Sequence, residues 1–250
     1  MSDTSLKPSD LPDMRRHYTR AHLSRESLHA DPIAQFERWL ADAVEAEVIE
    51  PNAMTLATST PDGRPLVRTV LLKSLDQRGF VFFTNLESRK AAHIAQNPHV
   101  SLVFPWLALE RQVIITGTAA KIPVTETIKY FLTRPRDSQI AAWASQQSRA
   151  ISSRKVLEME WAKIKEKFSA GEVPLPSFWG GFRVKPQTIE FWQGGPHRLH
   201  DRFQYTRAEA DAWTLARLAP SSPANLLTQR LQNDHDLQSQ TCSRAFILCM

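Results

Sequence analysis

The chain has 250 residues, of which 42% are hydrophobic and 23% are charged, a composition that is ordinary for a soluble globular protein. Its 31 Lys and Arg residues are interleaved with 26 Asp and Glu residues, giving a net charge of +5, which suits small anionic ligands at least as well as nucleic acid. The two cysteines, Cys242 and Cys249, stand close to the C-terminus, which excludes a disulfide framework or a cysteine metal site in the body of the chain.

The two ends of the chain differ in composition from the middle. We expect residues 1–29 to form a flexible N-terminal arm, residues 30–220 to form one folded domain, and residues 221–250 to be an appended, largely disordered tail. The opening MSDTSLKPSD lacks the apolar segment of a signal peptide, and no apolar run approaches membrane-spanning length. The sequence therefore predicts a cytoplasmic protein with no membrane partner and no nucleic-acid partner.

The folded part begins with a helix and continues in strands. Asp31 and Pro32 are typical of a helix start, as the cap and the first helical residue. Apolar residues at helical spacing predict a face toward the core, namely Ile33, Phe36, Trp39, Leu40 and Val44. The strand-like ranges 53–60, 65–75 and 80–85 follow, and the short turns between them predict an antiparallel meander.

A candidate anion site follows these strands. Ser88 is expected to cap a helix over residues 89–96, with Arg89 and Lys90 in the first turn. The helix dipole disfavours cations at this end, whereas a phosphate bound there would make both charges favourable. The alternative is a pair of exposed charges that each cost about 0.3–1 kcal/mol.

The next segment alternates between strands and helices. We expect strands over 100–105 and 111–122, a helix over 125–132 capped by Thr125, and helices over 136–144 and 154–168, the last capped by Ser153. Ile128, Phe131 and Leu132 are expected to form the buried face of the first of these helices. Tyr130, Arg134 and Ser138 are four residues apart, and their hydroxyls and guanidinium predict a phosphate-binding stripe that crosses a kink at Pro135.

A dense basic and aromatic stretch occupies residues 177–203. Alternation predicts that Arg198, His200 and Arg202 share one strand face, where their repulsion favours a flat anionic or electron-rich ligand; solvated arginines are the alternative. The predicted strands are 178–184, 188–193 and 213–218, and the predicted turns are 185–187 and 194–196.

Several motifs resemble one known family. They are RTVLLK from Arg68, FFTNLESRKA from Phe82, ERQV from Glu110, KYFLTRPRDSQIAAW from Lys129, and PLPSFWGGFRV followed by IEFWQGGPHRLHDRF. In this order they closely resemble the pyridoxine/pyridoxamine 5′-phosphate oxidases, from about Met14 to Pro220. The resemblance implies a mainly β, α+β split β-barrel with surrounding helices, assembled as a homodimer with FMN at the subunit interface. It also implies oxidation of pyridoxamine or pyridoxine 5′-phosphate by O2 to pyridoxal 5′-phosphate, with release of H2O2 and, from the amine, NH3.

Matching the family motifs residue by residue implies a set of ligand contacts. The residues implied to bind FMN are Arg68, Thr69, Val70, Leu71, Leu72, Lys73, Phe83, Thr84, Arg89, Lys90, Gln112, Gln147, Ser148, Trp192 and Arg202. Those implied to bind substrate are Arg15, Tyr18, Lys73, Tyr130, Arg134, Ser138, Arg198, Leu199 and His200. Arg198 and His200 are implied to be catalytic, by orientation and electrostatics, with acid–base action of His200 as an alternative. No metal site is expected.

The sequence departs from the family pattern in two places. His17 stands in the arm where relatives often carry an acidic residue, and residues 221–250 extend beyond the usual end of the family's chain. Two other functions remain as alternatives: a non-catalytic carrier of FMN or pyridoxal phosphate on the same barrel, and a flavin reductase that takes electrons from a nicotinamide.

Overall fold

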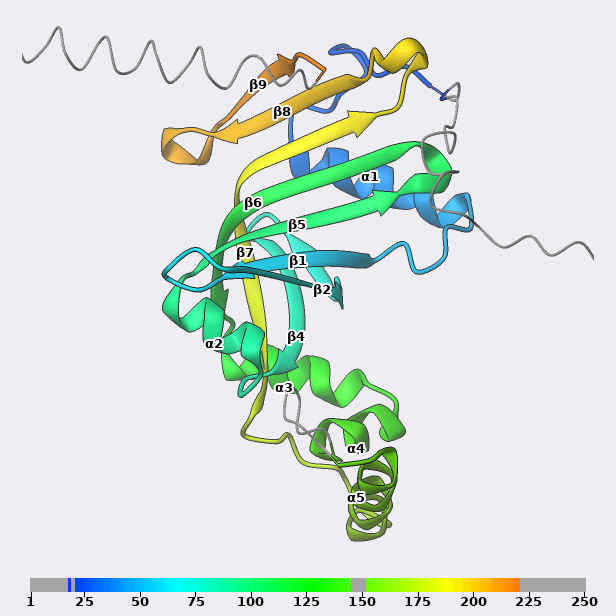
Figure 1. The fold of residues 1–250 in the computed structure, drawn as a ribbon, viewed down its shortest axis with the longest axis vertical. Coiled ribbons are helices and arrows are strands. Elements are labelled where there is room, and N and C mark those ends of the chain that lie inside the picture. Colours follow the sequence, from blue (N-terminus) through cyan, green and yellow to red (C-terminus); the bar gives the residue numbers. More distant parts are fainter. Residues whose placement is uncertain (1–17, 19–20, 145–151, 221–250) are drawn as a thin grey trace, which may run out of the picture.

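The computed structural model describes residue 18 and residues 21–144 and 152–220. They form an α+β fold in which a strongly curved antiparallel sheet carries α1 on one side and α3, α4 and α5 at one end (Figure 1). The helices are α1 (Pro32–Glu45), α2 (Arg89–Gln96), α3 (Val124–Thr133), α4 (Arg136–Ala144) and α5 (Arg154–Lys167). The strands are β1 (Ala53–Ser59), β2 (Pro65–Leu71), β3 (Ser74–Asp76), β4 (Gly79–Asn85), β5 (His99–Trp106), β6 (Arg111–Lys121), β7 (Trp179–Gln193), β8 (Asp201–Arg207) and β9 (Trp213–Leu218). The mainly β, α+β prediction is confirmed.

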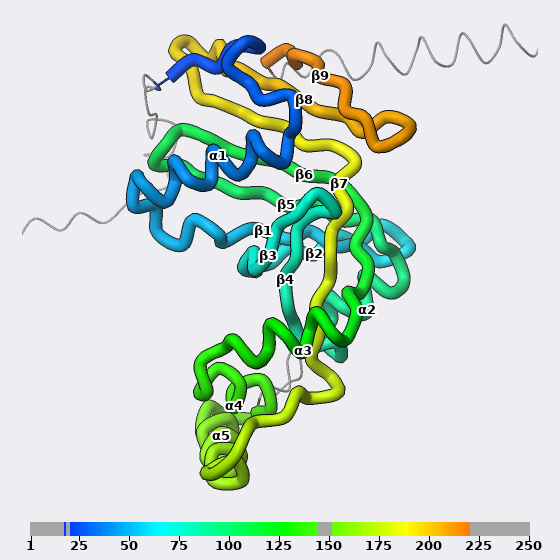
Figure 2. Tube along the Cα trace, turned by 180° about the vertical axis from the view of Figure 1, so that it is seen from behind, coloured from blue at the N-terminus to red at the C-terminus, as the bar shows by residue number. Residues whose placement is uncertain are grey.

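The strand β7 connects the two halves of the sheet. The strand order is β2-β1-β5-β6-β7-β4-β3, and β8 pairs with both β7 and β9. One edge of β7 pairs with β6 along its length, while the other edge pairs first with β4 and then with β8. Figure 2 shows the resulting bend, with β7 passing from the β8 side of the molecule down to the α3 side. A single long strand therefore positions both ends of the candidate site.

The turn predicted at residues 185–187 is wrong, because β7 runs through them without interruption. Proline lacks the N–H that a regular ladder needs, but the pairing register shifts here, between Thr116 and Gly117, and Pro186 lies opposite Gly117. A Cβ on Gly117 would lie 2.2 Å from the carbonyl oxygen of Lys185. The glycine therefore permits the close backbone approach that accommodates the proline.

The helix α1 covers the main core as predicted. Asp31 caps it by accepting a 2.9 Å hydrogen bond from the backbone N–H of Ile33. Phe36 is fully buried, with its ring 5.0 Å from that of Phe80, and burial of such a ring contributes about 1.5–3 kcal/mol. The prediction for Val44 is wrong, since it is 59% exposed.

The predicted meander is only partly correct. The range 65–75 divides into β2, which pairs with β1, and β3, which pairs with β4. The change of partner falls at Leu72 and Lys73, whose backbone N–H groups donate to Asn52 and Val81, respectively. The side chain of Lys73 is thereby placed at the junction between two hairpins.

Two helix predictions also need correction. The helix α3 begins at Val124, after Pro123, so Thr125 is not its cap. Its buried residues are Thr127 and Phe131, whereas Ile128 and Leu132 are 42% and 58% exposed. The helix α5 begins after Ser153 as predicted, but the described contacts include no capping hydrogen bond from the Ser153 side chain. No residue of α5 is buried.

A second apolar cluster lies beneath α3 and α4. It contains Phe131, Ile140, Phe168 and Trp179, so the start of β7 is packed directly against the helix that follows β6. None of the helices in the described ranges is both long enough and apolar enough to cross a membrane.

Candidate functional site

A hollow of about 230 Å³ opens between β2, β4 and the helices α2 and α3; we call it the cationic hollow. Its wall comprises Thr69, Val70, Leu71, Lys73, Phe83, Thr84, Lys90, Tyr130, Arg134 and Trp179. All of these except Trp179 were predicted from the sequence, some as contacts of FMN and some as contacts of the substrate phosphate. The fold therefore brings the two predicted sets together in one place.

Arg68 and Lys90 concentrate positive charge beside this hollow. Burial, and then the charge of Arg89, lower the pKa of Arg68. Burial, and then the charge of Arg68, lower the pKa of Lys90 to about 8, while its ammonium donates a 3.1 Å hydrogen bond to the hydroxyl of Thr84. Buried like charges repel one another, and a bound anion would offset that repulsion.

The Arg134 guanidinium forms a second cationic centre on the α3 side. Its central carbon lies 4.8 Å from the Trp179 ring centroid, and Trp179 continues a stack in which the rings of Phe83 and Tyr130 are 4.0 Å apart at 15°. Burial lowers the pKa of Arg134 and raises the pKa of Tyr130. This side of the hollow thus offers a set of hydrogen-bond donors beside three stacked aromatic rings.

Both arginines have an unsatisfied donor. Among the described residues, the buried side-chain nitrogens without a hydrogen-bond partner are Nε2 of Gln35, Nη2 of Arg68 and Nη1 of Arg134. Buried polar groups without a partner are rare in native proteins, and leaving such a group without a hydrogen bond costs about 1–3 kcal/mol of stability. A phosphate oxygen at each guanidinium would satisfy it, and charge-assisted bonds to phosphate are among the strongest that a side chain makes.

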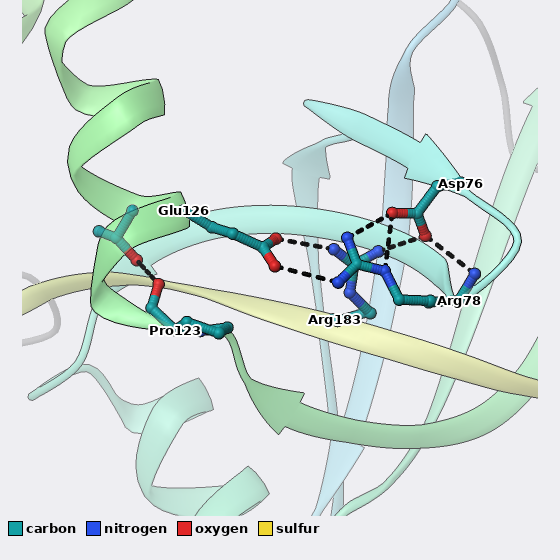
Figure 3. A network of polar contacts seen from close by, with 6 residues as sticks. Asp76, Arg78, Pro123, Glu126 and Arg183 are labelled. Carbon is teal, nitrogen blue, oxygen red and sulfur yellow. Dashed lines mark hydrogen bonds and ion pairs between the residues drawn. The ribbon is translucent and has the colours of Figure 1, made fainter.

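An ion-pair network holds α3 against the sheet (Figure 3). Arg183 on β7 contacts Asp76 at 2.6 Å and Glu126 at 2.9 Å, and Arg78 contacts the same two carboxylates at 2.7 and 3.1 Å. Burial opposes ionisation of Asp76, but hydrogen bonds from Arg78 and the charge of Arg183 outweigh it and hold the pKa of Asp76 below its ordinary value.

The network determines how α3 presents its polar side chains. Glu126, Tyr130 and Arg134 are spaced by four residues and so follow one face of the helix and its C-terminal cap. The first is held by the ion pairs and the other two line the cationic hollow. Anchoring the first turn of α3 therefore fixes the direction in which Tyr130 and Arg134 point.

A second hollow, of about 410 Å³, lies at the turn between β5 and β6; we call it the aromatic hollow. It is lined by Tyr18, Leu107, Glu110, Arg111, Gln112 and Trp192. His200 adjoins it, with its ring 4.7 Å from that of Trp192 and 5.7 Å from that of Tyr18. Of the predicted contacts, this hollow brings together Tyr18, Gln112 and Trp192.

The predicted alternation of Arg198, His200 and Arg202 along one strand is wrong. Residues Pro196–Arg198 form a tight turn, with φ of 54° at His197 and 63° at Arg198, and β8 begins only at Asp201. The turn is closed by the N–H of Leu199, which donates to the carbonyl of Pro196, and by the N–H of Gly195, which donates to Nδ1 of His200 at 3.2 Å. Because Nδ1 accepts, Nε2 is the ring nitrogen that carries the proton in neutral His200.

Arg202 is held by a partner that the sequence did not reveal. Its Nε and Nη2 donate to the two carboxylate oxygens of buried Glu190 at 2.8 and 3.1 Å, and these hydrogen bonds raise the pKa of Arg202. Strand alternation could have indicated the pair, since Glu190 and Trp192 share a face of β7 and Trp192 lies opposite Arg202. Trp179, on the wall of the cationic hollow, was also missed.

Several predicted residues lie elsewhere. Arg15, Gln147 and Ser148 lie outside the described residues, as does His17. Within the described part of the chain, neither hollow is lined by Arg68, Leu72, Arg89, Ser138, Arg198, Leu199, His200 or Arg202. No group of His, Cys, Asp and Glu among the described side chains is arranged to hold a metal ion.

Comparisons with known proteins find matches along most of the chain. A family model described as pyridoxamine 5′-phosphate oxidase matches residues 40–168, and one described as the C-terminal dimerisation region of pyridoxine 5′-phosphate oxidase matches residues 179–220. The pyridoxine/pyridoxamine 5′-phosphate oxidase of Crocosphaera subtropica is 59% identical over 213 residues, covering 84% of this chain and 100% of that protein.

Two solved structures are also similar. PhzG from Burkholderia lata, in complex with tetrahydrophenazine-1-carboxylic acid, matches with a TM-score of 0.74 and 32% identity, over 80% of this chain and 98% of that chain. A pyridoxamine 5′-phosphate oxidase-related, FMN binding protein from Nostoc punctiforme matches with a TM-score of 0.61 and 17% identity, over 74% and 97% of the two chains, which shows a shared fold.

Proposed function

The chain belongs to the pyridoxamine 5′-phosphate oxidase family, and we propose that it oxidises pyridoxamine 5′-phosphate and pyridoxine 5′-phosphate to pyridoxal 5′-phosphate. The amine reaction consumes O2 and water and releases NH3 and H2O2, whereas the alcohol reaction consumes O2 and releases H2O2. The observation that carries the proposal is the pair of half-buried guanidinium groups, on Arg68 and Arg134, that each keep one buried nitrogen without a partner among the described residues. Two phosphorylated ligands, cofactor and substrate, provide one anion for each.

The residues of the cationic hollow fit FMN as the cofactor. A phosphate ester bound here would satisfy Nη2 of Arg68, which lies beside the hollow, and would offset the burial and the Arg68 charge that lower the pKa of Lys90. When bound, FMN supplies a two-electron acceptor for the hydrogen removed from the substrate C4′ carbon and is regenerated by O2. The backbone of residues 69–71 and the Phe83–Thr84 pair provide walls for the rest of the cofactor.

The α3 side of the hollow is the proposed site of the substrate phosphate. Lys73, Tyr130 and Arg134 supply an ammonium, a hydroxyl and a guanidinium at its wall. The stacked rings of Phe83, Tyr130 and Trp179 exclude water, which strengthens the charge-assisted bonds. Ser138 and Arg15 remain proposed contacts of the same ligand, on the strength of the sequence motifs.

The catalytic proposal concerns Arg198 and His200. Arg198 is exposed in its turn, and the hydrogen bond from Gly195 fixes the ring of His200. Neither side chain forms an ion pair with an acidic residue in the described ranges, so both are available to orient a substrate. Arg202 is fixed by Glu190 and presents a positioned positive charge. We assign these residues to orientation and electrostatic stabilisation.

The separation of the predicted contacts into two hollows supports a site shared between two subunits. A dimerisation-region model covers residues 179–220, which include Trp192, His200 and Arg202, and it indicates a homodimer. We propose that the aromatic hollow of one protomer completes the cationic hollow of the other. The division into an arm, an oxidase domain and a tail, and the cytoplasmic location, remain parts of the proposal.

An aerobic assay tests the proposed function directly. The purified full-length chain is supplied with FMN and pyridoxamine 5′-phosphate, and pyridoxal 5′-phosphate, NH3 and H2O2 are measured together. The expected result is equal amounts of the three products, with unphosphorylated pyridoxamine much poorer as a substrate. Binding without O2 consumption would indicate the carrier, and NADPH oxidation without turnover of the phosphorylated amine would indicate the reductase.

A further inference from the structure

Behind Arg68, hydrogen bonds connect three elements of the fold. The Nη1 atom of Arg68 on β2 donates to the hydroxyl of Thr58 on β1 at 2.8 Å, and that hydroxyl is 3.2 Å from Nδ1 of His93 on α2. Thr58 is 2% exposed and His93 is half-buried. The sequence motifs that predict the ligand contacts include neither Thr58 nor His93.

The donor inventory determines the direction of the first bond, and the tautomer of His93 determines that of the second. A guanidinium can only donate, so the oxygen of Thr58 accepts from Arg68. The hydroxyl hydrogen of Thr58 is then available for Nδ1 of His93, which accepts it in the tautomer that carries its proton on Nε2. The path of hydrogen bonds from Arg68 through Thr58 to His93 is therefore satisfied when His93 is neutral and carries its proton on Nε2.

These bonds fix the orientation of the Arg68 guanidinium. Nη1 also donates to the backbone carbonyl of Leu56 at 3.0 Å, so one nitrogen is held by two acceptors on β1. Because the group is planar and rigid, holding Nη1 also determines where Nη2 lies. Nη2 is the buried nitrogen that has no partner among the described residues.

We propose that Thr58 and His93 are positioning residues that hold Arg68 so that its free Nη2 binds the phosphate of the flavin cofactor. This inference depends on the proposed function, because it takes FMN as the anion. The ligand contact is made by Arg68 alone, and Thr58 and His93 act through it. Their contribution is therefore specific to the phosphate end of the cofactor.

A comparison of FMN with riboflavin, which has the same ring system and no phosphate, separates positioning from general structural support. Dissociation constants of both flavins are measured by fluorescence quenching on the full-length chain freed of flavin. Thr58→Val, which is isosteric and lacks the hydroxyl, should weaken FMN about tenfold and change riboflavin by less than about twofold. Thr58→Ser, which keeps the hydroxyl, should bind FMN like the wild type.

A second pair of variants tests His93, the residue at the far end of this path of hydrogen bonds. His93→Leu removes the acceptor and should weaken FMN by about threefold, whereas His93→Asn keeps an acceptor near the Nδ1 position and should restore affinity. The double variant Thr58→Val/His93→Leu should bind FMN no more weakly than Thr58→Val alone, because both changes break the same path. If Thr58→Val does not fold, the dissociation constants of FMN and riboflavin for the two His93 variants test the positioning role in its place.

The outcomes distinguish the inference from its premise. A wild-type chain that binds FMN and riboflavin equally would overturn the phosphate site itself. A wild type that prefers FMN, with variants that lose both flavins equally or lose neither, would overturn the positioning role alone. Additive losses in the double variant would also contradict it.

Discussion

The charged ammonium of Lys90 should favour anion binding at the expense of the stability of the folded, flavin-free protein. Replacing Lys90 with an uncharged residue should therefore stabilise the flavin-free protein. Folding lowers the pKa of Lys90 from 10.5 to about 8, through burial and then the charge of Arg68. At about 1.4 kcal/mol per pKa unit, holding this ammonium charged in the flavin-free protein costs roughly 3 kcal/mol. Lys90→Met removes that cost but also loses the hydrogen bond to Thr84, worth about 1 kcal/mol. The flavin-free variant should therefore be more stable than the wild type by about 1–2 kcal/mol at pH 7.

The pH dependence follows from the sign of the shift. Between about pH 8 and 10.5, unfolded chains retain the Lys90 proton while folded chains have released it, so stability rises with pH across this window. The cost of charging Lys90 is fully present below pH 8 and disappears as the pH approaches 10.5. The stability advantage of Lys90→Met should therefore shrink across the window.

Urea denaturation of the flavin-free full-length chain, at pH 7 and at about pH 10, measures both effects. Lys73→Met is the matched control, because Lys73 is an exposed lysine on the wall of the same hollow and should give no such gain. Added FMN should stabilise the wild type far more than Lys90→Met. A Lys90→Met protein that is less stable at pH 7, or whose advantage does not change with pH, would refute the reasoning.

Three further predictions address the scaffold. Glu126→Gln should raise the KM for pyridoxamine 5′-phosphate about fivefold with kcat within about twofold, because Arg78 and Arg183 lose the anchor on α3; steady-state kinetics would contradict this if kcat alone fell. Glu190→Gln should lower the free energy of unfolding by about 1–3 kcal/mol, since half-buried Arg202 loses its counter-charge, and unchanged urea denaturation would show the pair to be dispensable. Gly117→Ala should destabilise by at least about 2 kcal/mol, because its Cβ would meet the Lys185 carbonyl at 2.2 Å; a calorimetric melting temperature equal to that of the wild type would show that the bulge can open freely.

The elements that were predicted correctly are those determined by neighbours in the chain. Asp31–Pro32 begins α1 and Ser88 caps α2 because both signals act within one helical turn. Lys185–Pro186–Gln187 has the composition of a turn, yet it continues β7, because Gly117 on another strand accommodates the proline. A bulge of this kind depends on a pairing between residues that are far apart in sequence, which local composition does not reveal.

The same distinction applies to the candidate site. Residues on one contiguous motif, such as Thr69, Val70 and Leu71, were predicted to act together and do line one hollow. Thr58 and Glu190 were missed, because their roles arise only when β1 pairs with β2 and when β7 pairs with β8. Arg198 and His200 were placed on a strand face, but the hydrogen bonds of a tight turn override alternation there.

The two cationic centres have the same physical design, although their supports differ. Arg68 is oriented by acceptors on β1, and Arg134 by the Trp179 ring and by a helix that ion pairs anchor to β7. Each support satisfies or packs part of the guanidinium and leaves one nitrogen buried without a partner. Such an arrangement is unfavourable for folding alone and becomes favourable only when an anion arrives. Since ligands that bind only the folded state stabilise it by mass action, the protein should gain most stability from the phosphorylated ligands on which it acts.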